Sequence, residues 1–163
     1  LLDKKIDMAL VENYIPDENI IYREWMEDEI VIFSNQPLPP KAKAKDLLSY
    51  KWVCRNPDSH TRLIFKESLD KANYPDCDTF NVTSEVTSAT TIVQTVLHSN
   101  KDEEPTVSVV SRKAIESLLK ADALYESRVG NQKMVRKLYI AYRKDRKHDA
   151  FIENVVDYLL KIK

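Results

Sequence analysis

Short apolar runs of strand length alternate along the chain with segments of helical period. Several of the runs are apolar at consecutive positions, as in strands that helices cover on both faces. The expected strands are residues 6–11, 29–33, 52–54, 80–83, 107–110, 124–129 and 138–142. The expected helices are residues 46–50, 59–72, 84–97, 111–121 and 149–162. This alternation predicts an α/β fold with mostly parallel sheets and with ligand sites at the carboxyl ends of strands.

The helix expected at residues 84–97 is the segment where two signals disagree. β-Branched residues, which favour strands, fill much of it. Val86, Ala89, Ile92 and Val96 nevertheless recur at the spacing of a helix face. We follow the period and expect a helix that begins at Ser84.

Hydroxyl-bearing residues open three of the expected helices, each directly after a strand or a tight turn. They are Ser59 with His60 and Thr61, then Ser84, and then Ser111. The first turn of a helix has unpaired N–H groups and partial positive charge, so phosphate, sulfate or carboxylate would suit such a position. Each serine alone is more simply explained as an N-cap. Three such helix starts at one edge of a sheet favour a polar ligand site.

The composition excludes several classes of protein. With 25 basic and 26 acidic residues, the chain lacks the basic surface typical of a nucleic-acid-binding domain. Its single glycine, Gly130, excludes the dinucleotide fingerprint, the phosphate-binding loop and the nucleophile elbow. No apolar run approaches the roughly 20 residues of a membrane span, and the given sequence does not open on a charged-then-apolar segment. We therefore expect a soluble cytoplasmic protein, and a chain that is a fragment, because Leu1 leads almost directly into a strand.

The residues that most often carry chemistry do not form a reactive set. Cys54 and Cys77 lack metal-ligand spacing, so we expect reduced thiols and no metal or cofactor. A redox sensor is the alternative, but a thiol in a buried strand is a poor thiolate. His60 lies between Ser59 and Thr61, where neighbouring side chains point in different directions and no carboxylate is placed to orient the imidazole. We do not expect an enzyme.

The order of the segments resembles the effector-binding, or substrate-binding, domain of LysR-type transcriptional regulators. The resemblance covers essentially the whole chain and depends on order and spacing rather than on one motif. The segments that carry it are residues 6–12, 25–33, 37–40 and 46–48, then Trp52-Val53-Cys54-Arg55 and Ser59-His60-Thr61-Arg62, and finally residues 138–145 with the last helix. It implies a periplasmic-binding-protein-like (type II) fold of two lobes, joined by two crossing hinge strands, with a small effector in the cleft.

The resemblance also implies how the chain is divided and what it does. Residues 1–28 and 138–163 would be the remnant of lobe I with the hinge strands, and residues 29–137 would be lobe II. Lobe I is expected to be incomplete, because two strand-helix units that normally precede residue 6 are missing. Binding of an anionic or zwitterionic effector would control DNA binding and transcription through an absent N-terminal winged helix-turn-helix. Further expected partners are other copies, as a dimer or a full-length tetramer, and no membrane.

Individual site residues follow from the same resemblance. Ser59 matches the effector-contacting hydroxyl, with His60 and Thr61 beside it, and Ser84 matches a helix start at the cleft wall. Glu12 follows the strand that leads out of lobe I, where it would either receive a cationic group of the effector or simply be solvated. The alternative function is a periplasmic-type solute-binding protein for a small anion or amino acid.

Overall fold

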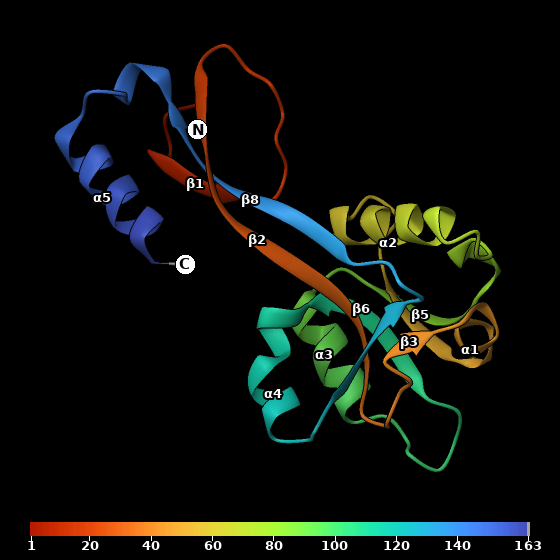
Figure 1. The fold of residues 1–163 in the computed structure, drawn as a ribbon. Coiled ribbons are helices and arrows are strands. Elements are labelled where there is room, and N and C mark those ends of the chain that lie inside the picture. The colour runs from red at the N-terminus through yellow and green to blue at the C-terminus, as the bar shows by residue number, and fades with distance from the viewer. Residues whose placement is uncertain (163) are drawn as a thin grey trace. The chain divides into compact units, whose positions relative to one another are not determined.

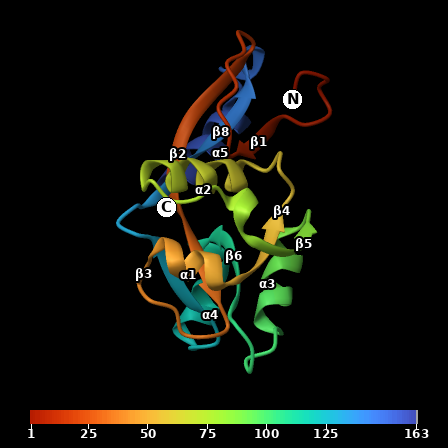
Figure 2. The same cartoon turned by 90° about the vertical axis from the view of Figure 1, so that its right-hand side faces the viewer.

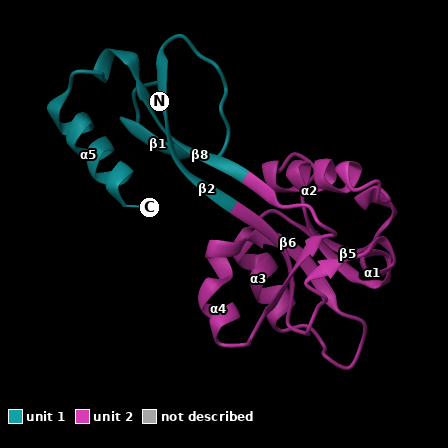
Figure 3. Ribbon diagram, in the orientation of Figure 1, with its two compact units in different colours: residues 1–28, 136–163 teal, residues 29–135 magenta. Residues whose placement is uncertain are grey.

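The computed structural model describes residues 1–162 of the chain (Figure 1). They divide into two compact units, which Figure 3 colours separately. Unit 1 comprises Leu1–Asp28 and the chain from Arg136 onward, and unit 2 comprises Glu29–Val135. The boundary falls within two long strands, β2 (Ile20–Ser34) and β8 (Met134–Arg143), so each strand contributes to both units.

The other elements are short. The remaining strands are β1 (Met8–Val11), β3 (Lys41–Ala42), β4 (Lys51–Arg55), β5 (Asn81–Val86), β6 (Thr106–Ser111) and β7 (Tyr125–Val129). The helices are α1 (Ala44–Ser49), α2 (His60–Lys71), α3 (Ala89–Leu97), α4 (Glu116–Lys120) and α5 (Ala150–Lys161), with 3-10 turns at Cys77–Thr79, Arg112–Ile115 and Lys144–Arg146. In the described part of the chain, no helix is long and apolar enough to cross a membrane.

The sheet of unit 2 is mixed, with the strand order β3-β7-β2-β6-β4-β5. β4 runs parallel to β5 and β6, and β3 runs parallel to β7. β2 is antiparallel to both of its neighbours in this unit, β6 and β7. The expectation of a mostly parallel sheet is confirmed for this unit, and β2 is the exception. Two strands that are parallel neighbours must be joined through a crossover connection. β2 has no such connection before it, because it enters this sheet directly as a strand shared with unit 1.

Alternate side chains of the central strands fill two separate cores in unit 2. Ile30 and Ile32 of β2 belong to one core, together with apolar residues of α1 and α2. Val31 and Phe33 belong to the other, together with residues of α3. Figure 2 shows α1 and α3 on opposite sides of β6. The expectation that helices cover these strands on both faces is confirmed.

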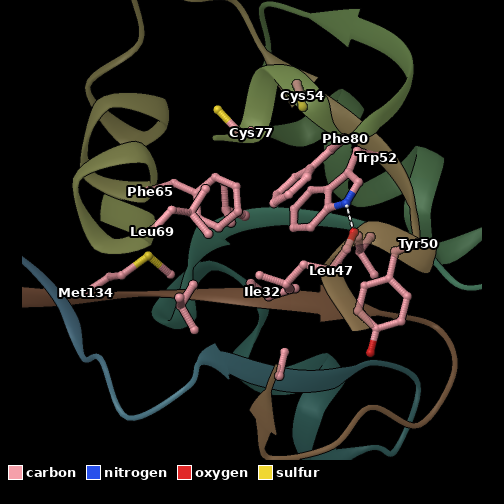
Figure 4. Packing of buried hydrophobic residues seen from close by; sticks show 14 of the residues in the cluster. Ile32, Leu47, Tyr50, Trp52, Cys54, Phe65, Leu69, Cys77, Phe80 and Met134 are labelled. Atoms are coloured by element: carbon pink, nitrogen blue, oxygen red, sulfur yellow. Dashed lines mark hydrogen bonds between the residues drawn. The ribbon is translucent and has the colours of Figure 1, made fainter. Parts of the chain in front are cut away.

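An aromatic group fixes the first core. The ring of Trp52, on β4, lies 5.1 Å from the rings of both Phe65 and Phe80, measured between centroids. Its indole N–H donates to the backbone carbonyl oxygen of Leu47 at 2.8 Å, as Figure 4 shows. Because Phe65 lies on α2 and Leu47 on α1, this one side chain holds both helices against β4.

Unit 1 is built around the end of β8. β1 pairs with β8 in antiparallel register, and Ile140 and Tyr142 of β8 pack against Ile152 and Val156 of α5. The indole N–H of Trp25 donates to the backbone carbonyl oxygen of Leu159, near the end of the same helix, at 2.8 Å. The face of α5 that carries Ile152 and Val156 is thus the buried one.

Two of the expected helices are present but differ from the prediction, one in its start and the other in its type. Residues 84–88 do not belong to a helix: β5 continues to Val86, and α3 begins only at Ala89 after the cap residue Ser88. The β-branched residues at the start of this segment decided its structure, against the helical period. The helix expected at residues 111–121 is a 3-10 turn followed by the short α4.

Candidate functional site

The carboxyl ends of β4, β5 and β6 meet at one edge of the sheet in unit 2, because these strands run in parallel. The strands end at Arg55, Val86 and Ser111, and Arg55 lies directly opposite Val86 in the register. The loop after β4 leads within a few residues to the start of α2. Ligands of open α/β sheets bind at such edges.

Ser59 is the N-cap of α2, as the sequence predicts. Its hydroxyl oxygen accepts a hydrogen bond from the backbone N–H of Arg62 at 3.1 Å. Accepting this bond leaves the hydroxyl hydrogen available to a ligand, so capping and ligand binding are compatible. His60 and Thr61 follow in the first turn; Thr61 is buried, whereas Ser59 and His60 are partly exposed.

Arg62 ties this helix start to the sheet. Its guanidinium donates to the backbone carbonyl oxygen of Arg55 at 2.9 Å and to the carboxylate of Glu85, on β5, at 3.0 Å. A longer contact of 3.3 Å joins it to Asp78. Because these groups already use the charge of Arg62, we assign it to positioning the site rather than to binding a ligand.

Arg55 is a candidate site residue that sequence reasoning did not single out. Its Nε atom is buried and has no hydrogen-bond partner within residues 1–162. A buried donor without a partner is energetically costly, so it marks a position where a ligand or water would be favoured. The signal in the sequence was a cationic residue ending an apolar strand, four positions before the helix cap.

The structure does not place Ser84 at a helix start, whereas Ser111 is the N-cap residue of the 3-10 turn Arg112–Ile115 that leads into α4. Ser84 lies within β5, opposite Val53, and Ser88 caps α3 by accepting from the backbone N–H of Thr91 at 3.4 Å. Ser111 is the last residue of β6, and its side chain forms no capping hydrogen bond with the turn that follows. Of the three expected helix starts, that of Ser59 is correct, that of Ser111 opens a 3-10 turn rather than an α-helix, and that of Ser84 is wrong.

Glu12 belongs to unit 1, where it follows β1. Its carboxylate forms an ion pair with the guanidinium of Arg136. The same guanidinium lies 2.9 Å from the carboxylate of Asp28, which is 2% exposed. Glu12 is therefore neither simply solvated nor an unpaired acid, and the structure assigns it to a charge cluster within unit 1.

The two cysteines are buried and unpaired thiols. Burial raises the pKa of Cys54 to about 11, and burial also raises the pKa of Cys77. Both are thus poor thiolates near neutral pH. Asp76, Cys77 and Asp78 bring ligand atoms within 4.8 Å of one another, but the ammonium of Lys66 lies 2.9 Å from Asp76 and neutralises that carboxylate.

The mixed open sheet, covered by helices on both faces and entered by a strand shared with a second unit, defines an α/β ligand-binding domain of the type II periplasmic-binding-protein class. Residues 1–162 match the LysR substrate binding domain. The chain belongs to this family, which favours a transcription regulator over the solute-binding alternative and agrees with the resemblance seen in the sequence.

Known proteins support this assignment. The chain is 26% identical over 162 residues to the uncharacterized HTH-type transcriptional regulator YeiE of Escherichia coli K12, covering 97% of this chain and 52% of YeiE. It thus spans about half the length of that relative. The CcmR regulatory domain of Synechocystis PCC6803, solved in complex with 2-PG, has a TM-score of 0.74 and 17% identity, covering 99% of this chain and 75% of that one. The effector binding domain of QuiR, solved with shikimate, has a TM-score of 0.70 and 17% identity, covering 99% and 73%.

Proposed function

We propose that this chain is the effector-sensing part of a cytoplasmic LysR-type transcription regulator. Its effector is a small anion, or a zwitterion bound through its anionic group. The binding surface in unit 2 is the helix start at Ser59, His60 and Thr61, together with Arg55 at the end of β4. Ser111, which ends β6 at the same edge of the sheet, forms its flank. Ser84 leaves the proposed set, because it does not open a helix.

The buried and unsatisfied Nε of Arg55 is the observation that carries this proposal. The N–H groups of the first turn of α2 and the hydroxyl of Ser59 supply neutral donors, and Arg55 supplies a cationic one. A carboxylate or phosphate accepts several hydrogen bonds at once and matches a guanidinium in geometry. The carboxylate shikimate, bound by the QuiR domain, is consistent with this chemistry.

Regulation follows from the difference in effector affinity between two states of the regulator. Complete switching between 1% and 99% of one state requires about 5.5 kcal/mol of differential affinity. Typical coupling energies are about 1–3 kcal/mol. We therefore propose a graded change in DNA binding rather than an all-or-none response, and no catalytic step.

A thermal-shift titration with sulfate, phosphate, carboxylates and amino acids tests the site. Ligand at 100 times its dissociation constant adds about 2.7 kcal/mol to the unfolding free energy, which corresponds to roughly 5–10 °C for a chain of this size. Ser59→Ala and Arg55→Met should each reduce this ligand-induced shift. Asp149→Ala is the matched control, because it removes an N-cap from α5 in unit 1 and should leave the shift intact.

The outcome against the proposal is equally specific. The site assignment fails if none of these compounds shifts the melting temperature, or if the shift is the same in wild type, Ser59→Ala and Arg55→Met. Comparing ligand-induced shifts, rather than melting temperatures, separates the ligand effect from the stability lost with the cap.

DNA binding is proposed to depend on another part of the regulator. The charge of this chain is balanced, so it offers no strong attraction to phosphates. We expect the chain alone to show no operator-specific band in a gel-shift experiment at physiological salt, and only weak, salt-sensitive binding. Tight sequence-specific binding by this chain would contradict that division of labour.

Self-association is proposed from the surface of unit 1. Several large apolar side chains are well exposed there, including Ile15 at 67%, Phe151 at 69% and Tyr158 at 63%. Exposed apolar surface of this kind is typical of interaction sites. We expect a concentration-dependent dimer, which light scattering over a dilution series would detect, whereas a strict monomer at all concentrations would contradict it.

A further inference from the structure

A small cavity of about 100 Å³ lies beside the carboxyl half of α2, within unit 2. Its other wall is the segment that enters β8, including Gln132 and Lys133. The volume is well above the roughly 10–15 Å³ that one water molecule needs. It is well below the 300–1,000 Å³, roughly, of pockets for drug-sized ligands. The cavity therefore suits a ligand of only a few heavy atoms.

Ser68 gives this cavity a polar wall. The residue is 5% exposed, and its hydroxyl oxygen has no hydrogen-bond partner within residues 1–162. A serine within a helix usually satisfies its hydroxyl by donating to the carbonyl oxygen of the preceding turn. Ser68 does not, and a buried hydroxyl without a partner is unfavourable. A ligand that accepts a hydrogen bond would remove this cost.

The charges around the cavity favour an anion. Lys71 and Lys133 both line it, both are exposed, and neither forms an ion pair within the described residues. Opposing them are the carboxylate of Glu67 and the end of the helix, which carries about half a negative charge. Lys133 also lies close enough to the carboxylate of Glu29 to lower its pKa, but Arg128 is paired with that carboxylate, so the two lysines still exceed the negative charge of the cavity wall. The side-chain amide of Gln132 is a further hydrogen-bond donor in the wall.

We propose that this cavity binds a small oxyanion of the size of sulfate or phosphate. The hydroxyl of Ser68 and the amide of Gln132 donate hydrogen bonds to it, and Lys71 and Lys133 supply the charge. The bound ion would join α2 to the residues that lead into β8. The site is distinct from the proposed effector surface, since α2 has 12 residues and is about 18 Å long, and Ser59 caps its other end.

Titration of the ¹⁵N-labelled chain by NMR tests the proposal. Sulfate, phosphate and acetate are added separately, with sodium chloride adjusted to hold the ionic strength constant. We expect saturable shifts of the backbone amides of residues 67–71 and 131–135 with the tetrahedral ions, and weaker binding of acetate, which has fewer oxygens. Equal binding of all three ions would show that the site also accepts carboxylates. Because carboxylates are oxyanions too, this result would still support the proposal.

Substitutions give the decisive comparison. Ser68→Ala should weaken binding by about tenfold, because it removes a hydrogen bond to a charged ligand. It should remain folded, since alanine has the highest helix propensity. Lys71→Gln combined with Lys133→Gln should abolish saturable binding. Ser117→Ala and Lys45→Gln are controls at exposed helical positions away from the cavity and should change nothing.

Two results would overturn the proposal. One is the lack of saturable shifts near Ser68 with any of the three ions. The other is an unchanged dissociation constant in Ser68→Ala and in the double lysine variant. Ser59→Ala distinguishes this site from the proposed effector surface, because it should leave the shifts of residues 67–71 unchanged whether or not that surface binds anions.

Discussion

The guanidinium of Arg62 donates to the backbone carbonyl oxygen of Arg55 at 2.9 Å. This bond joins the first turn of α2 to the last residue of β4, the two elements that form the proposed effector surface. The side chain of Arg62 is only 15% exposed, so solvent screens its contact with Glu85 less than it would screen a surface ion pair. In the sequence, Arg62 is visible only as a cationic residue seven positions after the end of a strand. Its partner is a backbone carbonyl oxygen, and no pattern of residues predicts such a partner.

Replacing Arg62 should loosen this edge of the sheet. Arg62→Met is expected to lower the unfolding free energy by about 2–3 kcal/mol, because hydrogen bonds to charged groups contribute about 1.5–3 kcal/mol. Arg62→Lys should recover only part of the loss, since one ammonium cannot reproduce the planar fork. Urea unfolding measures both. Lys120→Met, which removes an exposed ion pair with Glu116, is the control and should lower the unfolding free energy by less than about 0.5 kcal/mol. If Arg62→Met lowers it by no more than this control, the contacts of Arg62 are unimportant for stability.

The ion pair between Arg136 and Asp28 supports unit 1 in a different way. Asp28 is 2% exposed, so removing its arginine partner leaves a carboxylate in a buried position. Arg136→Met should therefore destabilise the chain by about 3 kcal/mol, in the range measured for broken buried pairs. Adding Asp28→Asn should restore much of this loss, because it removes the buried charge.

A double-mutant cycle by chemical unfolding measures this coupling. If Asp28→Asn and Arg136→Met add without interaction, the pair contributes no coupling energy, and the buried charge is held by other groups. Glu12→Gln in the same background reports on the second carboxylate, which is about half exposed and should cost less.

The sequence predicted the sheet better than the site. Strands that bury both faces must be apolar at consecutive positions, and Ile30, Val31, Ile32 and Phe33 show this plainly. The direction of β2 could not be inferred, because the pattern of one strand does not specify which neighbours it pairs with. The buried Nε of Arg55 and the unsatisfied hydroxyl of Ser68 were also beyond prediction, since both depend on which partners the fold leaves out of reach.

The start of α3 shows how two local rules compete. The helical spacing placed the cap at Ser84, whereas the structure places it at Ser88, four residues later. We expect Ser88→Ala to lower the unfolding free energy by about 0.5–2 kcal/mol, as for other N-caps. The long 3.4 Å hydrogen bond to Thr91 favours the lower end of this range.

Ser84→Ala is the matched comparison for this cap. It lies within β5 and caps no helix, so it should leave the helical circular dichroism and the stability of α3 unchanged. A larger loss of helical signal in Ser84→Ala than in Ser88→Ala would show that α3 begins earlier than the structure places it.

Burial of Cys54 predicts how the stability of the chain depends on alkaline pH. Its pKa is about 11 in the folded chain, whereas an exposed thiol has a pKa of about 8.5. Below about pH 8.5 both states keep the thiol neutral, and its contribution to stability is fully present. Between about 8.5 and 11 the unfolded chain loses this proton and the folded chain keeps it. The unfolding free energy should therefore fall as the pH rises, by at most about 1.4 kcal/mol per pH unit from this residue.

Cys54→Ala isolates this contribution from those of other groups that ionise at high pH, such as Cys77 and the tyrosines. The variant should be less stable than wild type at pH 7, because it loses a buried sulfur atom, but its stability should fall less steeply between pH 9 and 10.5. Urea unfolding at a series of pH values gives both slopes. At pH 7.5, Ellman's reagent should react with Cys54 far more slowly in the folded chain than in urea. Parallel slopes for the two proteins, or fast labelling of native Cys54, would show an ionisable thiol and would reopen the redox-sensor alternative.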